Sequence, residues 1–151
     1  MKSALDEEFD AADVVVMTAA VADYRPRSAA EHKLRKTSGL DGEGLALERT
    51  DDILAGLGAA AKTQVLVGFA METQDLVASA QRKLHAKGLH LVVANHLGTP
   101  GAGFAGATNV VTLVTREGAK PLPLMSKEKV ADQLLDTILP MLGDVTREDI
   151  P

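Results

Sequence analysis

Three positively charged side chains lie within four residues of one another in Lys33-Leu34-Arg35-Lys36, next to His32. Cations this close repel one another unless an anion lies between them. A triphosphate would supply that anion, and a loop that closes could bring the three side chains onto it. The alternative is a basic loop that is fully solvated, and these residues alone leave both interpretations open.

A carboxylate, Asp23, follows the apolar run that ends near Ala19, within the segment Ala-Ala-Val-Ala-Asp-Tyr-Arg of residues 19–25. At the end of a buried strand it could hold Mg²⁺ or orient a hydroxyl group of a ligand. A cap on a turn or helix is the alternative role for an aspartate at this place.

Two further lysines, Lys83 and Lys87, are four residues apart and therefore share one face of the helix expected there. With Arg82 they could form a second contact to an anion. A solvated helix face with no ligand is the alternative.

Polar or aromatic residues also follow two other expected strands. Phe69 ends one of them and could wall a pocket for a base or a sugar, or simply pack in the core, and Glu72 could cap a helix or bind a ligand. Asn95 and His96 form a polar pair at the end of the next strand. His96 is a weak metal ligand, since no second histidine or carboxylate lies at ligand spacing.

The elements that must position these side chains follow from the apolar pattern. Short β-branched runs predict strands, and stripes of apolar residues three and four apart predict helices. We expect strands at residues 13–17, 45–49, 64–69, 89–94 and 109–115, and helices at 2–10, 53–61, 74–87 and 127–142, with Thr73 as a cap and Gly88 as a stop.

This alternation predicts an α/β fold: a Rossmann-like open, mostly parallel sheet with helices on both faces. Polar residues 26–44 have no clear period and are expected to form a flap, and residues 116–123 a short C-terminal hairpin. All 151 residues are expected to form one domain. Ligands of such sheets bind beyond the carboxyl ends of the strands, where residues 19–25, 68–73 and 94–98 could converge.

The composition limits the class of partner. The chain has 46% hydrophobic residues but only 3% aromatic ones, so its core must consist of aliphatic side chains. A net charge of −5 argues against nucleic acid or an anionic membrane as the main partner. The absence of cysteine excludes disulfides and thiolate chemistry. No apolar run approaches the ~20 residues that span a bilayer, and the acidic N-terminal residues are unlike a signal peptide, so we expect a cytoplasmic protein.

Five segments, in this order, resemble the phosphopantothenoylcysteine synthetase domain of coenzyme A biosynthesis. The resemblance extends from about residue 9 to residue 142. The matching segments are residues 19–25, residues 33–36 (the family's K-x-K-K), residues 50–53 (a looser match to N-P-D-I), residues 68–73 (G-F-A-x-E-T in full) and Ala94-Asn95 (A-N-D, with His96 in the third place).

The resemblance implies a two-step ligation. CTP activates the carboxylate of 4′-phosphopantothenate as an acyl-cytidylate and releases pyrophosphate. The amine of cysteine then displaces CMP and forms an amide. Catalytic roles fall to Lys33 and Asp23, with Asp23 near Mg²⁺. The CTP contacts implied by position are Ala19, Asp23, Lys33, Asp51, Asp52, Ile53, Leu54, Phe69, Lys83 and Lys87. A homodimer and an FMN-dependent decarboxylase domain fused upstream are implied as partners.

One departure from the family concerns its first strand, glycine-rich turn and Arg-Tyr-Ile-Thr-Asn-type segment, for which this sequence has no match. We therefore expect an N-terminally truncated synthetase domain that makes little amide product alone, even where CTP binds. A non-catalytic nucleotide-binding or dimerising module is the alternative. An NAD(P)-dependent Rossmann oxidoreductase is a distant third, because the G-x-G-x-x-G at residues 101–106 does not join a strand to a helix.

Overall fold

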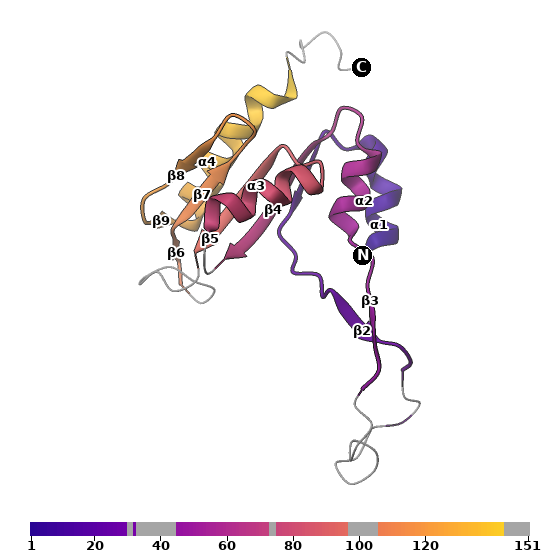
Figure 1. Cartoon of the computed structure of the whole chain (residues 1–151). Helices are drawn as coiled ribbons and strands as arrows, with labels where there is room; N and C mark the ends of the chain where they lie inside the picture. Colours follow the sequence, from indigo (N-terminus) through magenta and orange to yellow (C-terminus); the bar gives the residue numbers. More distant parts are fainter. Residues whose placement is uncertain (30–31, 33–44, 73–74, 97–105, 144–151) are drawn as a thin grey trace. The chain divides into compact units, whose positions relative to one another are not determined.

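The computed structural model describes residues 1–29, 32, 45–72, 75–96 and 106–143 (Figure 1). The chain divides into two compact units. The first contains Met1–Thr18 and Ile53–Pro151, and the second contains Ala19–Asp52.

The first unit contains the central sheet and all of the described helices. Its helices are α1 (Lys2–Glu8), α2 (Ile53–Ala60), α3 (Leu76–Ala86) and α4 (Lys127–Ile138), with the short 3₁₀ turns η1 (Phe9–Ala11) and η2 (Leu139–Leu142). Its strands are β1 (Val14–Met17), β4 (Val65–Glu72), β5 (Leu91–His96), β6 (Thr108–Asn109), β7 (Val111–Val114), β8 (Ala119–Pro121) and β9 (Met125–Ser126).

Five strands form the sheet, in the order β1-β4-β5-β7-β8. β1, β4 and β5 are parallel, β7 runs antiparallel to β5, and β8 runs antiparallel to β7. Four of the five strands therefore point the same way, as expected for a mostly parallel sheet. β6 and β9 pair separately. β8 is the edge piece of the predicted hairpin, and its Pro121 is tolerated because an edge strand needs fewer ladder donors.

Helices cover both faces of this sheet (Figure 1). Because side chains alternate along a strand, Leu66 and Val92 face α2 and α3, while Val67 and Val93 face α4. Central strands buried on both faces must be largely apolar, which is why residues 65–67 of β4 and 91–94 of β5 were recognisable as aliphatic runs. The prediction of a Rossmann-like α/β sheet with helices on both faces is confirmed. Within the described residues, no helix is long and apolar enough to cross a membrane.

Two helix boundaries differ in detail from the expectation. α3 begins after Asp75, a left-handed residue with φ of 49° that makes no side-chain cap bond, whereas the sequence suggested Thr73, which lies outside the described residues. α4 ends at Ile138 and the chain continues as a 3₁₀ turn, because Pro140 has no N–H to donate to the next helical bond.

The second unit contains a small antiparallel hairpin. β2 (Tyr24–Pro26) pairs with β3 (Leu47–Arg49), and an ion pair joins Arg25 to Glu48 at 2.7 Å. The guanidinium of Arg49 lies 5.9 Å from the centre of the Tyr24 ring. The sequence predicted the strand that contains β3 but not β2, whose three residues end in a proline. Most of the expected flap, residues 26–44, lies outside the described residues.

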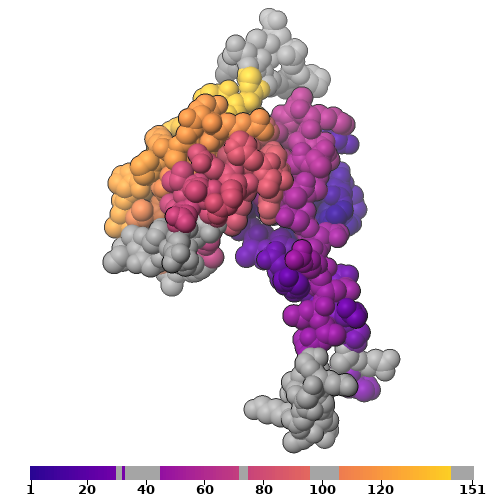
Figure 2. Space-filling view, in the orientation of Figure 1, coloured from indigo at the N-terminus to yellow at the C-terminus, as the bar shows by residue number. Residues whose placement is uncertain are grey.

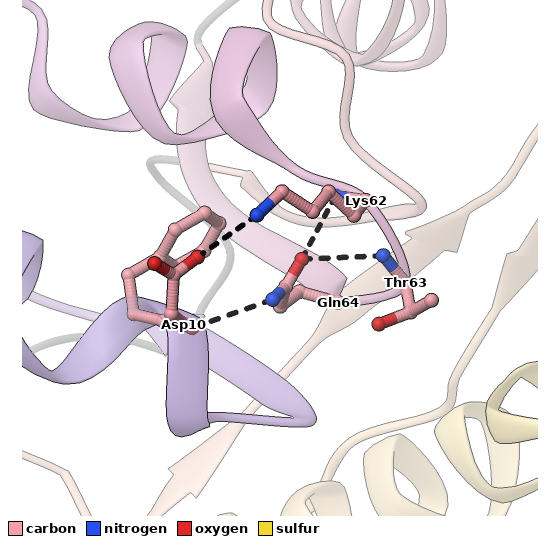
Figure 3. A network of polar contacts seen from close by, with 5 residues as sticks. Asp10, Lys62, Thr63 and Gln64 are labelled. Atoms are coloured by element: carbon pink, nitrogen blue, oxygen red, sulfur yellow. Dashed lines mark hydrogen bonds and ion pairs between the residues drawn. The ribbon is translucent and has the colours of Figure 1, made fainter.

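The buried side-chain amide of Gln64 links the loop between α2 and β4 to the N-terminal segment by hydrogen bonds (Figure 3). The Gln64 side chain is 5% exposed, and its Oε1 accepts hydrogen bonds from the backbone N–H of Lys62 at 2.9 Å and of Thr63 at 3.2 Å. Its Nε2 donates to the Phe9 carbonyl at 3.4 Å. An exposed ion pair between Lys62 and Asp10 lies beside this network.

Replacing the Gln64 amide should therefore lower the free energy of unfolding more than breaking the Lys62–Asp10 ion pair does. Gln64→Leu leaves the two loop N–H groups without their acceptor and removes one of the two donors to the Phe9 carbonyl, and we expect a loss of about 1–3 kcal/mol in the free energy of unfolding. Lys62→Ala removes only an exposed pair and should cost less than about 1 kcal/mol. Urea unfolding of the three proteins checks this. Equal stability of Gln64→Leu and wild type would mean that water replaces the amide.

A second polar contact ties β4 to the start of β5. The backbone N–H of Leu66 donates to Nδ1 of His90 at 3.1 Å, which requires an unprotonated ring nitrogen. Burial, and secondarily the charge of Arg116, lowers the pKa of His90 from its usual 6.5.

Stability should consequently fall in mild acid. Because the pKa of His90 is lower in the folded chain than in the unfolded chain, the unfolded chain binds more protons in mild acid. The hydrogen bond to His90 therefore stabilises the fold fully above the unfolded-state pKa. This stabilisation is lost as the pH falls through the folded-state pKa. We expect wild type to lose more unfolding free energy than His90→Asn between about pH 8 and about pH 5. Asparagine can accept the same N–H without titrating. Parallel losses in the two proteins, measured by urea unfolding, would assign the acid sensitivity to other groups.

A candidate anion-binding pocket between α2 and α3

The C-terminal end of α3 is fixed by a glycine turn. Lys87 is the C-cap, and Gly88 follows with a φ of +64°, which only glycine adopts without strain. The N–H of Leu89 donates to the Leu84 carbonyl at 2.8 Å, and the N–H of Gly88 donates to the His85 carbonyl at 3.3 Å. This is a Schellman motif, with Leu84 and Leu89 buried together beneath it. The predicted helix stop at Gly88 is confirmed.

A second glycine brings α2 directly against this turn. A Cβ on Gly58 would lie 2.9 Å from the carbonyl carbon of Lys87 and would overlap its oxygen. α2 therefore touches the turn after α3 through the main chain, and Figure 2 shows the surface of α2 beside that of the α3 region. Only a residue without a side chain permits this approach.

The close approach leaves a small pocket beside it. A cavity of about 80 Å³ lies between the two helices and the sheet. Its lining residues are Leu54, Gly68, Phe69, Ala70, Lys83, Lys87, Leu89 and Val92. Ala70, Leu89 and Val92 are buried and form an apolar floor, whereas Lys83 is exposed and Lys87 half-buried.

An apolar floor beneath two lysines suits one kind of ligand, namely an anion that also carries an apolar group. The lysines lie where the α3 dipole is negative, so part of their charge is balanced by the helix end. An anion bound there must rely on the lysine ammonium groups and not on backbone N–H groups, which point away from a helix C-terminus.

Four residues expected to contact CTP are brought together by this pocket. Leu54 comes from α2, Phe69 from β4, and Lys83 and Lys87 from the last turn of α3. Ile53 is buried at the start of α2, one residue before Leu54.

The Phe69 side chain does not form the floor of the pocket. In the regular register of β4 with β5, Phe69 is paired with Val93 and so shares its sheet face, opposite to Ala70. The ring is 43% exposed there. Phe69 thus borders the pocket through its main chain, and its ring is exposed on the opposite face of the sheet.

The expected strand ends meet in part. β4 and β5 are in parallel register to their last residues, so Met71 lies beside Asn95 and the β4 segment 68–72 runs alongside the β5 segment 92–96. The Oδ1 atom of Asn95 is buried and has no hydrogen-bond partner among the described residues. Residues 19–25 belong to the second unit.

Within the second unit, the candidate carboxylates lie at the base of the hairpin. The Asp23 carbonyl accepts from the backbone N–H of Thr50 at 2.9 Å, and the Thr50 hydroxyl donates to the Ala22 carbonyl. These bonds place Asp51, which follows Thr50, close in the hairpin to Asp23, and Asp52 comes next. The side chains of Asp23 and Asp51 are exposed, as is Ala19.

No group of three or more histidine, aspartate or glutamate side chains among the described residues could hold a metal ion by itself. Mg²⁺ does not require one, because in nucleotide sites it commonly takes one or two carboxylates and completes its shell with phosphates and water. The exposed Asp23 carboxylate fits that role. Lys33, Arg35 and Lys36 lie outside the described residues.

Sequence reasoning missed the floor of the pocket. Gly68 and Ala70 lie in the segment 68–73 that was expected near the ligand, but neither was assigned a contact, and Leu89 and Val92 were interpreted as ordinary strand residues, because burial in a core and burial beneath a ligand need the same side chains. A glycine inside an otherwise apolar strand was an available signal, since such glycines often mark a close approach of a ligand or of another backbone.

The fold and this pocket define an α/β domain with a small cavity on one sheet face that two lysines border. Residues 1–141 match the sequence family described as the DNA/pantothenate metabolism flavoprotein C-terminal domain. The chain belongs to this family.

Curated relatives and solved structures agree with this assignment. The chain is 48% identical over 139 residues to the coenzyme A biosynthesis bifunctional protein CoaBC of Bacillus subtilis, covering 91% of this chain and 34% of the relative. It is 39% identical over 132 residues to CoaBC of Vibrio vulnificus, covering 87% and 33%. A crystal structure of the C-terminal domain of a CoaBC protein superposes with a TM-score of 0.74 at 35% identity, covering 95% of this chain and 61% of that chain. The chain thus spans about a third of the length of these curated relatives.

Two glycines of α2 provide a matched test of the helix contact. Gly58→Ala places a methyl group into the Lys87 carbonyl and should lower the free energy of unfolding by about 1–3 kcal/mol or more. Gly56→Ala meets nothing within 4 Å and should raise it by about 0.5–1 kcal/mol, because alanine is the better helix former. Thermal or urea unfolding measures both. Similar effects of the two substitutions would show that α2 does not press on the turn after α3.

Proposed function

We propose that this chain is the synthetase part of a coenzyme A biosynthesis protein, which joins cysteine to 4′-phosphopantothenate and uses CTP. The observation that carries the proposal is the pocket that groups Leu54, Phe69, Lys83 and Lys87, all four of which the family resemblance assigns to CTP. Family membership and the CoaBC relatives support the pathway.

The proposed reaction has two balanced steps. The carboxylate of 4′-phosphopantothenate attacks the α-phosphorus of CTP, forming an acyl-cytidylate and releasing pyrophosphate. The cysteine amine then attacks the acyl carbon, losing a proton, and CMP leaves. The first step brings an anionic carboxylate against a triphosphate, so positive groups must offset their repulsion. Lys83 and Lys87 supply such charge at the pocket.

The remaining roles follow from the sequence. Lys33, with Arg35 and Lys36, is proposed to close over the triphosphate, since excluding water protects an acyl-cytidylate from hydrolysis. Asp23 is proposed to bind Mg²⁺, which when present would neutralise part of the phosphate charge, and Asp51 and Asp52 are proposed to contact the nucleotide. FMN belongs to the decarboxylase part that the resemblance places upstream, and this chain is assigned no role in binding it.

A homodimer is proposed as the working assembly. The hairpin of the second unit supports this, because Tyr24, Leu45 and Leu47 are each at least half exposed. Two-stranded hairpins are marginally stable in water without further packing. A second protomer would bury these apolar side chains.

Calorimetric titration of the chain with CTP and Mg²⁺ tests nucleotide binding. We expect CTP to bind more tightly than ATP. Lys87→Ala should lower the affinity for CTP by about tenfold, the size expected for one charge-assisted contact. Lys62→Ala is the matched control, since it removes the same charge from an exposed pair elsewhere. Equal affinity for CTP and ATP would remove the cytidine assignment.

Turnover separates the ligase from a non-catalytic nucleotide-binding module. The test uses a chimera of the Bacillus subtilis relative in which this chain replaces the 139 matching residues. We expect the chimera to form 4′-phosphopantothenoylcysteine and CMP in equal amounts. A soluble chimera that binds CTP but forms no amide would favour the module.

A further inference from the structure

Gly68 occupies an unusual place for a glycine, in the interior of the buried strand β4. Gly68 is buried, as is Ala70 on the same sheet face, and it is paired with Met17 of β1 and Val92 of β5. A glycine there has no side chain to pack and loses more chain entropy on folding than any other residue, so it weakens the strand. Its presence calls for a local reason.

Backbone conformation does not supply that reason. The glycines with positive φ among the described residues are Gly88, Gly118 and Gly143, so Gly68 has a conformation open to other residues. Nor does another main chain press on it, as one does at Gly58. A Cβ on Gly68 would lie 2.9 Å from Cδ1 of Leu89 and 3.0 Å from Cδ2 of Leu54, which are the ends of flexible side chains.

Both of those side chains line the pocket, as does Gly68 itself. A methyl group at residue 68 would enter the space between Leu54 and Leu89 and push their ends toward the cavity. With a volume of only about 80 Å³, the cavity has little room to absorb such a shift. The absence of a side chain at Gly68 thus preserves the depth of the cavity.

We propose that Gly68 is a specificity-determining residue that sets the depth of the pocket for the base of the nucleotide. This inference rests on the proposed function, in which Lys83 and Lys87 hold the phosphates. The two ends of the ligand then depend on different residues. The lysines act on charge, whereas the floor above Gly68 acts on the size of the apolar group that enters.

Gly68→Ala tests this division with two probes, CTP and inorganic triphosphate, each titrated calorimetrically in the presence of Mg²⁺. The variant should lower the affinity for CTP by at least about tenfold and leave the affinity for inorganic triphosphate within about twofold of wild type, because only the base contacts the floor of the pocket. Gly56→Ala, the same change in open space on α2, should leave both affinities unchanged.

A second substitution keeps the test decisive if Gly68→Ala folds poorly. Leu54→Ala removes one of the two δ carbons that the new methyl group would strike and gives the Leu89 side chain room to move, so the double variant Gly68→Ala/Leu54→Ala should be more stable than Gly68→Ala and should bind CTP more tightly. If the double variant is more stable than Gly68→Ala but binds CTP no better relative to inorganic triphosphate, the role of Gly68 is purely structural and the inference is overturned.

The outcomes separate this inference from the function on which it rests. Wild type that binds no CTP overturns the proposed function, and the inference with it. Wild type that binds CTP while Gly68→Ala binds it equally well overturns the inference alone. Weakening of 4′-phosphopantothenate instead of CTP by Gly68→Ala would assign the floor to the acid substrate and overturn the assignment to the base.

Discussion

The contact between the backbone of α2 at Gly58 and the carbonyl of Lys87 is the constraint on which the candidate site depends. It sets how far α2 stands from the end of α3, and thereby how far Leu54 stands from the two lysines. The Schellman turn at Gly88 makes the contact possible, because it turns the chain away from the helix and buries Leu89 beneath it. A wider spacing would open the pocket to solvent, and a larger residue at 58 would force that spacing.

The sheet explains why this pocket lies where it does. β4 and β5 are covered on one face by α2 and α3 and on the other by α4, so a ligand near their centre must enter between helices. The seam between α2 and α3 is such a place, and Gly68 lies beneath it, paired with the last residue of β1. The packing that stabilises the sheet and the pocket that interrupts it therefore share the same residues.

Much of this architecture could be predicted from the sequence, because long aliphatic runs and helical stripes report local burial. The strands around Val67 and Val93, the stop at Gly88 and the grouping of Lys83 with Lys87 all followed from pattern and spacing. β2 was missed because three residues ending in Pro26 carry almost no strand signal. The pairing of Gly58 with Lys87 could not be foreseen, since the two residues are distant in sequence and a glycine within a helix is ordinarily only a weak point. The roles of Lys33 and Asp23 still rest on the family resemblance.

Charge and shape have separate tasks at this site. The chain carries a net charge of −5, so an anionic ligand gains nothing from the overall field and must be bound by local positive groups. In the proposed site Lys83 and Lys87 are these groups, but long flexible ammonium side chains discriminate poorly among phosphate-bearing ligands, because each acts as a point charge. Discrimination must then come from rigid parts of the pocket, which here are the main chain of β4 and the buried aliphatic floor. A strand glycine is suited to that task, since it shapes the cavity without adding a group that could move.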